Sequence, residues 1–184
     1  MRPIHTIGHS TRSVEELIGL LRESGIRLLV DVRRYPGSRR HPQFGRDALA
    51  AALRAAGIEY VHEPDLGGRR EPRPDSPNTA WRNSGFRGYA DYMATPPFRA
   101  ALERLVARGE EEPTAIMCAE AVPWQCHRRL IADALVARGI PVIHILGPER
   151  TESHELHPDA RVGPDGTVSY PAGGEGPAQA DLFE

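Results

Sequence analysis

The apolar run Thr114–Cys118 and the segment that follows it constrain the fold of this chain more than any other stretch. A short uncharged run of this kind is typical of a buried strand. Pro123 then suits the first turn of a helix, which we expect to continue to about Arg138. A strand that leads directly into a helix is the unit of a parallel α/β sheet, in which ligands bind beyond the carboxyl ends of the strands.

The same alternation of strand and helix recurs along the chain. Besides 114–118, we expect strands at 2–7, 28–32, 58–62 and 141–146, and helices at 13–25, 46–56, 89–93 and 97–108. The sequence therefore predicts a single α/β domain over residues 1–170, with a mostly parallel sheet of about five strands and helices on both faces. A small C-terminal hairpin is expected at 162–170, and the glycine- and proline-rich residues 171–184 are expected to form a flexible tail.

The composition is that of an ordinary soluble protein. The 184 residues are 40% hydrophobic with a net charge of −2, and no apolar run approaches the roughly 20 residues of a membrane span. Two cysteines are too few for a disulfide scaffold, so we expect a cytoplasmic protein. All 23 basic side chains are arginines, whose fork fits phosphate and carboxylate groups. A genome that favours arginine codons accounts for the overall bias, so only local arginine clusters carry functional information.

Polar residues follow three of the expected strands, and the carboxyl ends of parallel strands meet at one rim of a sheet. We therefore expect one pocket that contains His9, Ser10, Arg33, Ser38, Arg39, Glu120, Cys126, His127 and Arg128. A turn that only connects two elements needs generic turn residues. The presence of histidine, arginine, cysteine and glutamate at these turns therefore favours an active site over loops that are polar only because they lie at the surface.

Cys126 is the candidate nucleophile of this pocket. In the first turn of a helix, unpaired amide groups would favour its thiolate, with His127 and Arg128 adding to the effect. Glu120 and His9 are candidate general acids or bases, whereas Arg33, Arg39 and Arg128 are candidate phosphate ligands. The alternative is that Cys126 is a small core residue, as we expect for Cys118.

Residues 64–88 contain too much proline and glycine for regular structure, and so long a loop is usually a lid, a binding loop or disordered. Its arginines and aromatic residues suggest contacts with a nucleic acid, through Arg69, Arg70, Trp81 and Arg87. No phosphate-binding glycine loop or dinucleotide motif is present, and the spacing of the cysteines does not favour zinc. No metal is predicted, and the sequence does not identify a cofactor. The pair His154 and His157 is expected to be solvated.

Several separated motifs resemble the domain-of-unknown-function 488 family. They are Thr6–Ser10, Asp31–Arg33 with Pro36 and Ser38, Leu66–Gly68, Tyr89–Met93, Cys118–Glu120 and Cys126–Arg128. The resemblance covers roughly residues 2–170. It implies a compact α/β domain with a shared site at these motifs, to which Tyr89 would contribute a substrate contact. It implies no particular reaction.

Two shorter similarities bear on function. Residues 125–128, Gln-Cys-His-Arg, are similar to the Pro-Cys-His-Arg motif of alkylguanine-DNA alkyltransferases, although Gln125 replaces the proline. Residues 179–183 are similar to the pentapeptide by which bacterial polymerases dock on the sliding clamp. Gln179 would form the hydrogen bonds and Leu182 and Phe183 would be the apolar anchors.

The leading hypothesis is therefore an enzyme that processes base or alkyl lesions in DNA and is brought there by a clamp-binding tail. Its partners would be the sliding clamp and a DNA or nucleotide substrate, with no membrane. The alternatives are an enzyme acting on a phosphorylated or sulfur-containing metabolite, and a non-catalytic clamp adaptor.

Overall fold

A computed structural model describes residues 1–37 and 39–173 of the protein. Ser38, a predicted site residue, lies outside the described residues. So do the predicted clamp-binding residues Gln179, Leu182 and Phe183.

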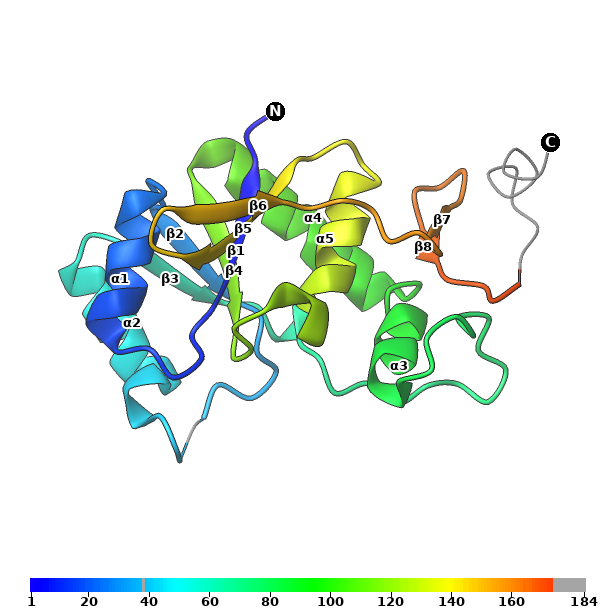
Figure 1. Ribbon diagram of the computed structural model, residues 1–184, viewed down its shortest axis with the longest axis horizontal. Coiled ribbons are helices and arrows are strands. Elements are labelled where there is room, and N and C mark those ends of the chain that lie inside the picture. The colour runs from blue at the N-terminus through cyan, green and yellow to red at the C-terminus, as the bar shows by residue number, and fades with distance from the viewer. Residues whose placement is uncertain (38, 174–184) are drawn as a thin grey trace.

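The domain is built on one six-stranded sheet with the strand order β3-β2-β4-β1-β5-β6 (Figure 1). The strands are β1 (Ile4–Gly8), β2 (Leu28–Asp31), β3 (Glu59–His62), β4 (Thr114–Cys118), β5 (Val142–Gly147) and β6 (Arg150–Ser153). The first five are parallel and β6 is antiparallel to β5, which confirms the predicted mixed α/β fold. The sequence analysis missed β6 because its four residues are polar and exposed, so they show no apolar pattern.

Helices cover both faces of the sheet. They are α1 (Val14–Glu23), α2 (Arg46–Ala55), α3 (Ser84–Tyr92), α4 (Pro96–Glu111) and α5 (Arg128–Val136). Alternate strand residues point to opposite faces. Leu29 and Met117 thus pack in one core with α1 and α2, whereas Val30 and Ile116 pack in the other with α3, α4 and α5. Short 3-10 turns at Pro42–Phe44, Pro64–Leu66 and Pro123–Gln125 (η1, η2 and η3) bring the chain to the rim.

The long loop before α3 is held to the body of the protein by a buried carboxylate. Asp91 of α3 accepts hydrogen bonds from Ser76 Oγ at 2.6 Å, Asn78 Nδ2 at 2.7 Å and the Arg73 amide at 2.8 Å. The side-chain oxygen Oδ1 of Asn78 accepts a further hydrogen bond from the Tyr170 amide, 92 residues away in sequence. This part of the loop is therefore packed on α3 and on the segment that contains Tyr170.

The predicted hairpin near the C-terminus is present. It consists of β7 (Arg161–Val162) and β8 (Val168–Ser169), and its turn contains Gly166 at a φ of 81°. Among the described residues, no helix is both long and apolar enough to cross a membrane.

Candidate functional site

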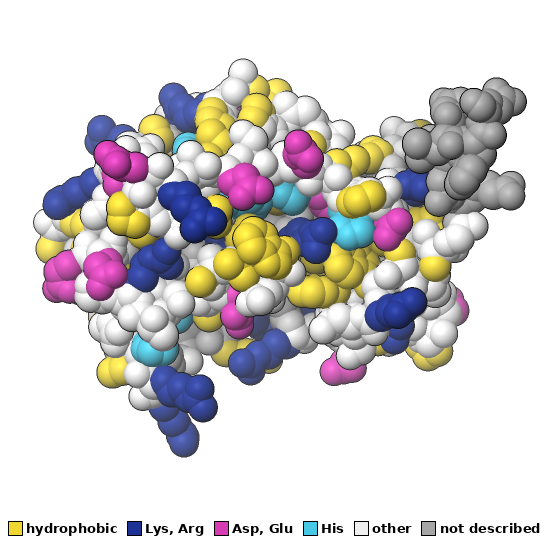
Figure 2. Space-filling view, in the orientation of Figure 1, with side chains coloured by type: hydrophobic (Ala, Val, Ile, Leu, Met, Phe, Trp, Pro, Cys, Tyr) yellow, Lys and Arg dark blue, Asp and Glu magenta, His cyan; other side chains and the backbone are white. Residues whose placement is uncertain are grey.

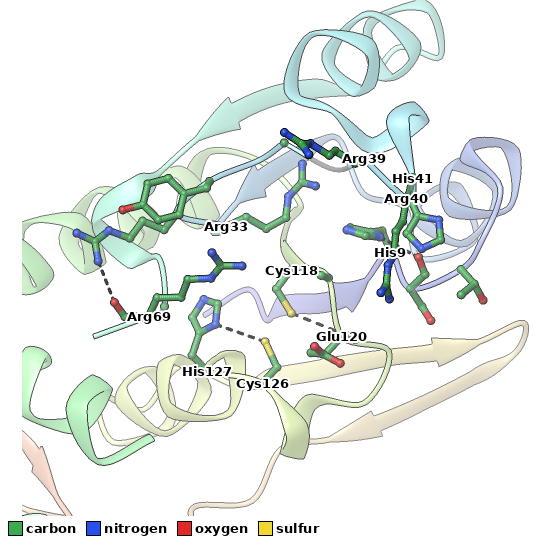
Figure 3. Close-up of a pocket in the computed structure, with 17 residues that line it drawn as sticks. His9, Arg33, Arg39, Arg40, His41, Arg69, Cys118, Glu120, Cys126 and His127 are labelled. Carbon is green, nitrogen blue, oxygen red and sulfur yellow. Dashed lines mark hydrogen bonds between the residues drawn. The ribbon is translucent and has the colours of Figure 1, made fainter. Parts of the chain in front are cut away.

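The ends of β1, β2 and β4 surround a cavity of about 660 Å³ (Figure 3). The sheet order explains why distant residues meet there, because Gly8 is in register with Cys118, and Asp31 with Met117. The predicted residues that line the cavity are His9, Ser10, Arg33, Arg39, Arg69, Glu120, Cys126 and His127. Convergence of the three strand ends on one pocket is thus observed.

Gly8, at the end of β1, allows the segment that carries His9 and Ser10 to approach the turn after β4. A Cβ atom at Gly8 would collide with the backbone carbonyl of Glu120. The close approach extends the sheet contacts beyond the strands, with the His9 amide donating to Cys118 O and the Ser10 amide to Ala119 O, both at 2.9 Å. The two turns that carry candidate catalytic groups are therefore fixed to one another.

Cys126 and His127 form a pair inside the cavity. Cys126 Sγ lies 3.5 Å from His127 Nδ1, and His127 Nε2 lies 3.0 Å from the Val32 carbonyl oxygen. Because a carbonyl can only accept, Nε2 carries a proton, and Nδ1 is the ring atom that can exchange a proton with the sulfur. The ring of Tyr89 packs at 5.1 Å from His127, and the Tyr89 hydroxyl donates to Leu66 O at 2.7 Å. Tyr89 thus holds the imidazole and does not itself line the cavity.

Cys126 lies between η3 and α5, and not within the first turn of a helix that starts at Pro123, as expected from the sequence. Its backbone is extended, and its sulfur accepts the Arg128 amide at 3.5 Å, at the N-terminus of α5. The predicted electrostatic effect of a helix terminus is therefore retained, although the segment 123–127 is not α-helical.

The two thiols of the cavity differ in acidity. Burial acts to raise the pKa of Cys126, but the neighbouring thiol of Cys118, His127 and the guanidinium of Arg128 together bring it well below its ordinary value. Burial and the adjacent Cys126 raise the pKa of Cys118 well above the ordinary value. Cys126 is therefore the more acidic thiol of the pair and Cys118 the less acidic one.

Arg128 is fully buried, and its hydrogen bonds hold part of the site in place. It donates to the Glu120 carbonyl at 2.7 Å and to Thr6 Oγ1 at 3.2 Å, while its Nε has no hydrogen-bond partner. No carboxylate of the described residues forms an ion pair with it. Arg128 thus holds the Glu120 turn and favours negative charge on Cys126, in place of the predicted substrate contact.

A chain of hydrogen bonds continues behind Arg128. Thr6 Oγ1 lies 2.6 Å from His144 Nδ1, His144 Nε2 lies 2.9 Å from His154 Nδ1, and His154 Nε2 lies 2.7 Å from Asp133 Oδ1. Burial is the main factor that lowers the pKa of His144 to about 3, so this ring is neutral. The expectation that His154 is solvated was wrong, because its side chain is 7% exposed and bonded to a fully buried aspartate.

Arginine side chains surround the opening of the cavity. Arg39, Arg40 and Arg69 are exposed and line it, and Figure 2 shows arginine side chains gathered on the projecting loop between β2 and α2. Arg33 is instead buried against Asp31, with Nε to Oδ1 at 2.9 Å and Nη2 to Oδ2 at 2.7 Å. The exposed arginines, and not Arg33, are therefore the better ligands for an anion.

His9 lies beside these arginines. Its ring stacks on Phe44 with the centroids 4.5 Å apart, and Nδ1 donates to Ser10 O at 2.9 Å. Burial lowers the pKa of His9, so the ring is neutral near pH 7 with its lone pair at Nε2. Glu120 is exposed at the edge of the cavity, where its carboxylate faces solvent. Both groups are thus placed to exchange protons with a bound molecule.

The predicted nucleic-acid contacts do not all reach this site. Arg69 lines the cavity, whereas Arg70 lies over the ring of Tyr92 at 3.8 Å. Trp81 is 8% exposed and packs against Tyr170 at 5.3 Å, and Arg87 donates to the Trp81 carbonyl at 3.5 Å. The indole would have to leave this packing before it could stack on a base.

Four lining residues with charged or ring-bearing side chains were not singled out from the sequence: Arg34, Tyr35, Arg40 and His41. All lie in the run after β2 in which the arginines were noticed. Tyr35 is 61% exposed, with the guanidinium carbons of Arg34 and Arg69 at 5.4 and 5.8 Å from its ring. An exposed aromatic residue within an arginine run was the signal that could have identified this part of the site.

Fold and cavity together define an α/β protein with a cysteine–histidine pair and an arginine-lined opening at the carboxyl rim of its sheet. The family model described as "Domain of unknown function DUF488" matches residues 13–135, and the chain belongs to this family. The matched range contains β2, β4 and the pair Cys126 and His127. No curated protein and no solved structure matches the chain.

Proposed function

We propose that this protein is an enzyme in which the Cys126 thiolate attacks an electrophilic carbon or sulfur atom of a phosphate-bearing substrate. The observation that carries the proposal is the contact of Cys126 Sγ with His127 Nδ1, combined with the contact of His127 Nε2 with a backbone carbonyl. A nucleophile, a base and a group that orients the base are the parts that activate a catalytic cysteine.

The surrounding charges suit an anionic substrate. The exposed guanidinium groups of Arg39, Arg40 and Arg69 would hold a phosphate at the opening. The thiolate would then attack the substrate atom above it and form a thioether, thioester or disulfide bond as the leaving group departs. His127 would hold the thiol proton and release it to the leaving group, and the neutral His9 would accept a proton from water if the adduct is hydrolysed.

Trapping of the covalent adduct tests this proposal. Incubation with phosphorylated metabolites that carry a thioester, disulfide or alkyl leaving group should add mass to the peptide containing Cys126, as seen by mass spectrometry. Cys126→Ser should form no adduct, and His127→Gln should form it more slowly while remaining folded. If no phosphorylated electrophile modifies Cys126, and iodoacetamide alkylates it no faster than a free cysteine, the proposal is wrong.

Alkylated nucleic acid is a second candidate substrate, and the cavity is large enough to admit a nucleotide. A volume of about 660 Å³ lies within the range of about 300–1,000 Å³ for ligand sites, so a flipped nucleotide could enter with its phosphates on the arginines. The Cys126 thiolate would then accept the alkyl group from the base, as the similarity to alkyltransferases suggests. The tail residues Gln179, Leu182 and Phe183 would tether the protein to the sliding clamp and raise its concentration at DNA.

Two measurements distinguish these candidates. Transfer of a labelled alkyl group from a double-stranded oligonucleotide to Cys126 would establish the nucleic-acid reaction. If no transfer occurs, the nucleic-acid candidate is excluded and the small-molecule reaction is the candidate that stands. Deletion of residues 178–184 should abolish binding to the sliding clamp with no change in thermal unfolding. Unchanged clamp affinity would remove the tether. Clamp binding without any reaction at Cys126 would favour an adaptor.

A further inference from the structure

Both cysteines of the protein meet in the same cavity. Cys118 ends β4 and Cys126 follows seven residues of turn and η3, and both line the cavity. Figure 3 shows the two side chains pointing toward one another, and each thiol changes the pKa of the other. The proposed reaction uses only Cys126, which leaves a second sulfur beside the nucleophile without a role.

We propose that Cys118 is the resolving thiol of Cys126, and that a hydroperoxide converts the pair into a reversible intramolecular disulfide. The inference rests on the thiolate at Cys126 that the proposed function also requires, and it adds a redox reaction and a regulatory state to the same site. The ligand it implies is a hydroperoxide, either hydrogen peroxide or an organic one, that is small enough to reach Cys126 through the arginine-lined opening.

The first step oxidises Cys126. Its thiolate attacks the distal oxygen of the hydroperoxide, a sulfur–oxygen bond forms, and the oxygen–oxygen bond breaks. The alkoxide or hydroxide that leaves takes up a proton, which His127 can supply from Nδ1, 3.5 Å from the sulfur. Cys126 becomes a sulfenic acid and the peroxide is reduced to an alcohol or water.

The second step joins the sulfurs. Cys118 attacks the sulfur of the sulfenic acid, the sulfur–sulfur bond forms, and the hydroxyl group leaves with the Cys118 proton as water. In sum, one hydroperoxide and two thiols give one disulfide, one alcohol and one water. The different acidities of the two thiols suit this division of roles, because the thiolate reacts first and the protonated thiol is preserved for the second step.

The surroundings of the pair allow the sulfurs to join. Cys126 lies outside α5 in extended backbone, so its movement does not break a turn of helix. Its sulfur would give up the contacts with the Arg128 amide and His127, each at 3.5 Å, and would gain a covalent bond to Cys118. Cys118 would give up a 3.9 Å contact with the Glu120 carbonyl. The disulfide would consume the nucleophile, so oxidation would switch off the proposed reaction until a thiol reduces it.

Peptide mapping of the full-length protein after hydrogen peroxide treatment tests the inference. The reduced protein is exposed to a small excess of peroxide, and free thiols are then blocked. We expect a Cys118–Cys126 disulfide in the monomer, the simultaneous loss of both free thiols, and recovery of both with dithiothreitol. A Cys126 sulfinic acid with Cys118 still free, or disulfides only between molecules, would overturn the inference.

The variant Cys118→Ser supplies the matched comparison. Without a resolving thiol, Cys126 should be captured by dimedone as a sulfenic acid and should convert to the sulfinic form that dithiothreitol does not reverse. If Cys118→Ser resists overoxidation as well as the wild type does, Cys118 is not the resolving thiol. If this variant does not fold, mapping of the wild-type protein decides by itself.

The outcomes also separate this inference from the proposed function. Fast alkylation of reduced Cys126 without disulfide formation would leave the proposed nucleophile in place and remove the redox pair. If the disulfide forms but no phosphorylated electrophile or alkylated oligonucleotide modifies Cys126, the redox pair stands and the proposed function is wrong.

Discussion

A single methyl group added at Gly68 tests whether His127 controls the reactivity of Cys126. An ideal Cβ at Gly68 would lie 3.0 Å from Nδ1 and 3.4 Å from Cγ of His127. The first contact is shorter than ordinary van der Waals distance, so in Gly68→Ala the ring must move by a few tenths of an ångström or the new methyl group must be compressed. Nδ1 is the atom that faces Cys126 Sγ.

Two magnitudes decide which of these happens. A methyl group forced into a filled site costs about 1–3 kcal/mol. The hydrogen bond from His127 Nε2 to the Val32 carbonyl contributes only about 0.5–1.5 kcal/mol net. We therefore expect the ring to shift and weaken that bond, so the unfolding free energy falls by about 1 kcal/mol and the contact with Cys126 is lost.

The chemical consequence is larger than the loss of stability. An ordinary thiol with a pKa of about 8.5 is only about 3% ionised at pH 7, so complete loss of the thiolate-stabilising environment would slow alkylation by about thirtyfold. Because Cys118 and Arg128 still act on the sulfur in Gly68→Ala, we expect a decrease of about three- to tenfold, within that limit.

The assay is the rate of iodoacetamide alkylation of Cys126 at pH 7, followed by peptide mass spectrometry, with urea unfolding as the measure of stability. Gly37→Ala is the matched control, because Gly37 lines the same cavity and its Cβ would have no atom within 4 Å. We expect the control to react at the wild-type rate. If Gly68→Ala also does, His127 does not set the reactivity of Cys126 and the central argument for the site is wrong.

Three further predictions concern stability and pH. Asp133→Ala should lower the unfolding free energy in urea by about 3 kcal/mol, because three donors, one buried and two partly buried, lose their acceptor. Tyr170→Phe removes one of these donors and should cost about 1 kcal/mol. Alkylation of Cys126 should remain fast as the pH is lowered below 7, since the pKa of Cys126 in the folded protein is well below the ordinary value. The stability gained from this thiolate is fully present above the pKa of Cys126 in the unfolded chain, and it is lost as the pH falls through the pKa of Cys126 in the folded protein. A rate that declines tenfold per pH unit from pH 8 downwards would contradict this. Burial acts to raise the pKa of Glu63, but two arginines outweigh it and the pKa is lowered, so Glu63→Gln should weaken the loss of stability in acid; unchanged acid unfolding would contradict that ion-pair assignment.

The convergence of the site was predictable because it depends on topology more than on detail. Short apolar runs such as Thr114–Cys118 identify the parallel strands, and parallel strands end at one rim. His9, Arg33 and Cys126 therefore meet even though 117 positions separate the first from the last. The spacing of Asp31 and Arg33 also contained information that the sequence analysis did not use. Residues two apart on an extended chain share a side, which is how this arginine comes to be paired within its own segment.

The interpretation of the loop before α3 as a nucleic-acid surface stays a prediction, because long-range contacts decide which side of a loop is buried. Proline, glycine and arginine predicted irregular backbone over 64–88, which is correct as far as Asn83 but wrong from Ser84, where α3 begins. Its anchoring depends on Asn78 and Asp91, and on a partner at Tyr170 near the far end of the described chain. No local sequence pattern indicates such a contact. From the sequence, an arginine-rich loop that contains Trp81 resembles a nucleic-acid surface, whereas in the structure the Trp81 side chain is part of the core.

The burial of Arg128 is a second feature that no local sequence pattern indicates, and it bears on the ionisation of Cys126. A guanidinium in the core carries a large desolvation cost unless negative charge lies close to it. The nearest carboxylate along the hydrogen-bond chain is Asp133, reached only through Thr6 and two histidines. The Cys126 thiolate is the other negative charge that acts on this arginine, and it lies at the cavity. The buried cation and an ionised sulfur would stabilise one another, so the positive charge that the sequence suggested for substrate binding instead favours the ionised form of Cys126.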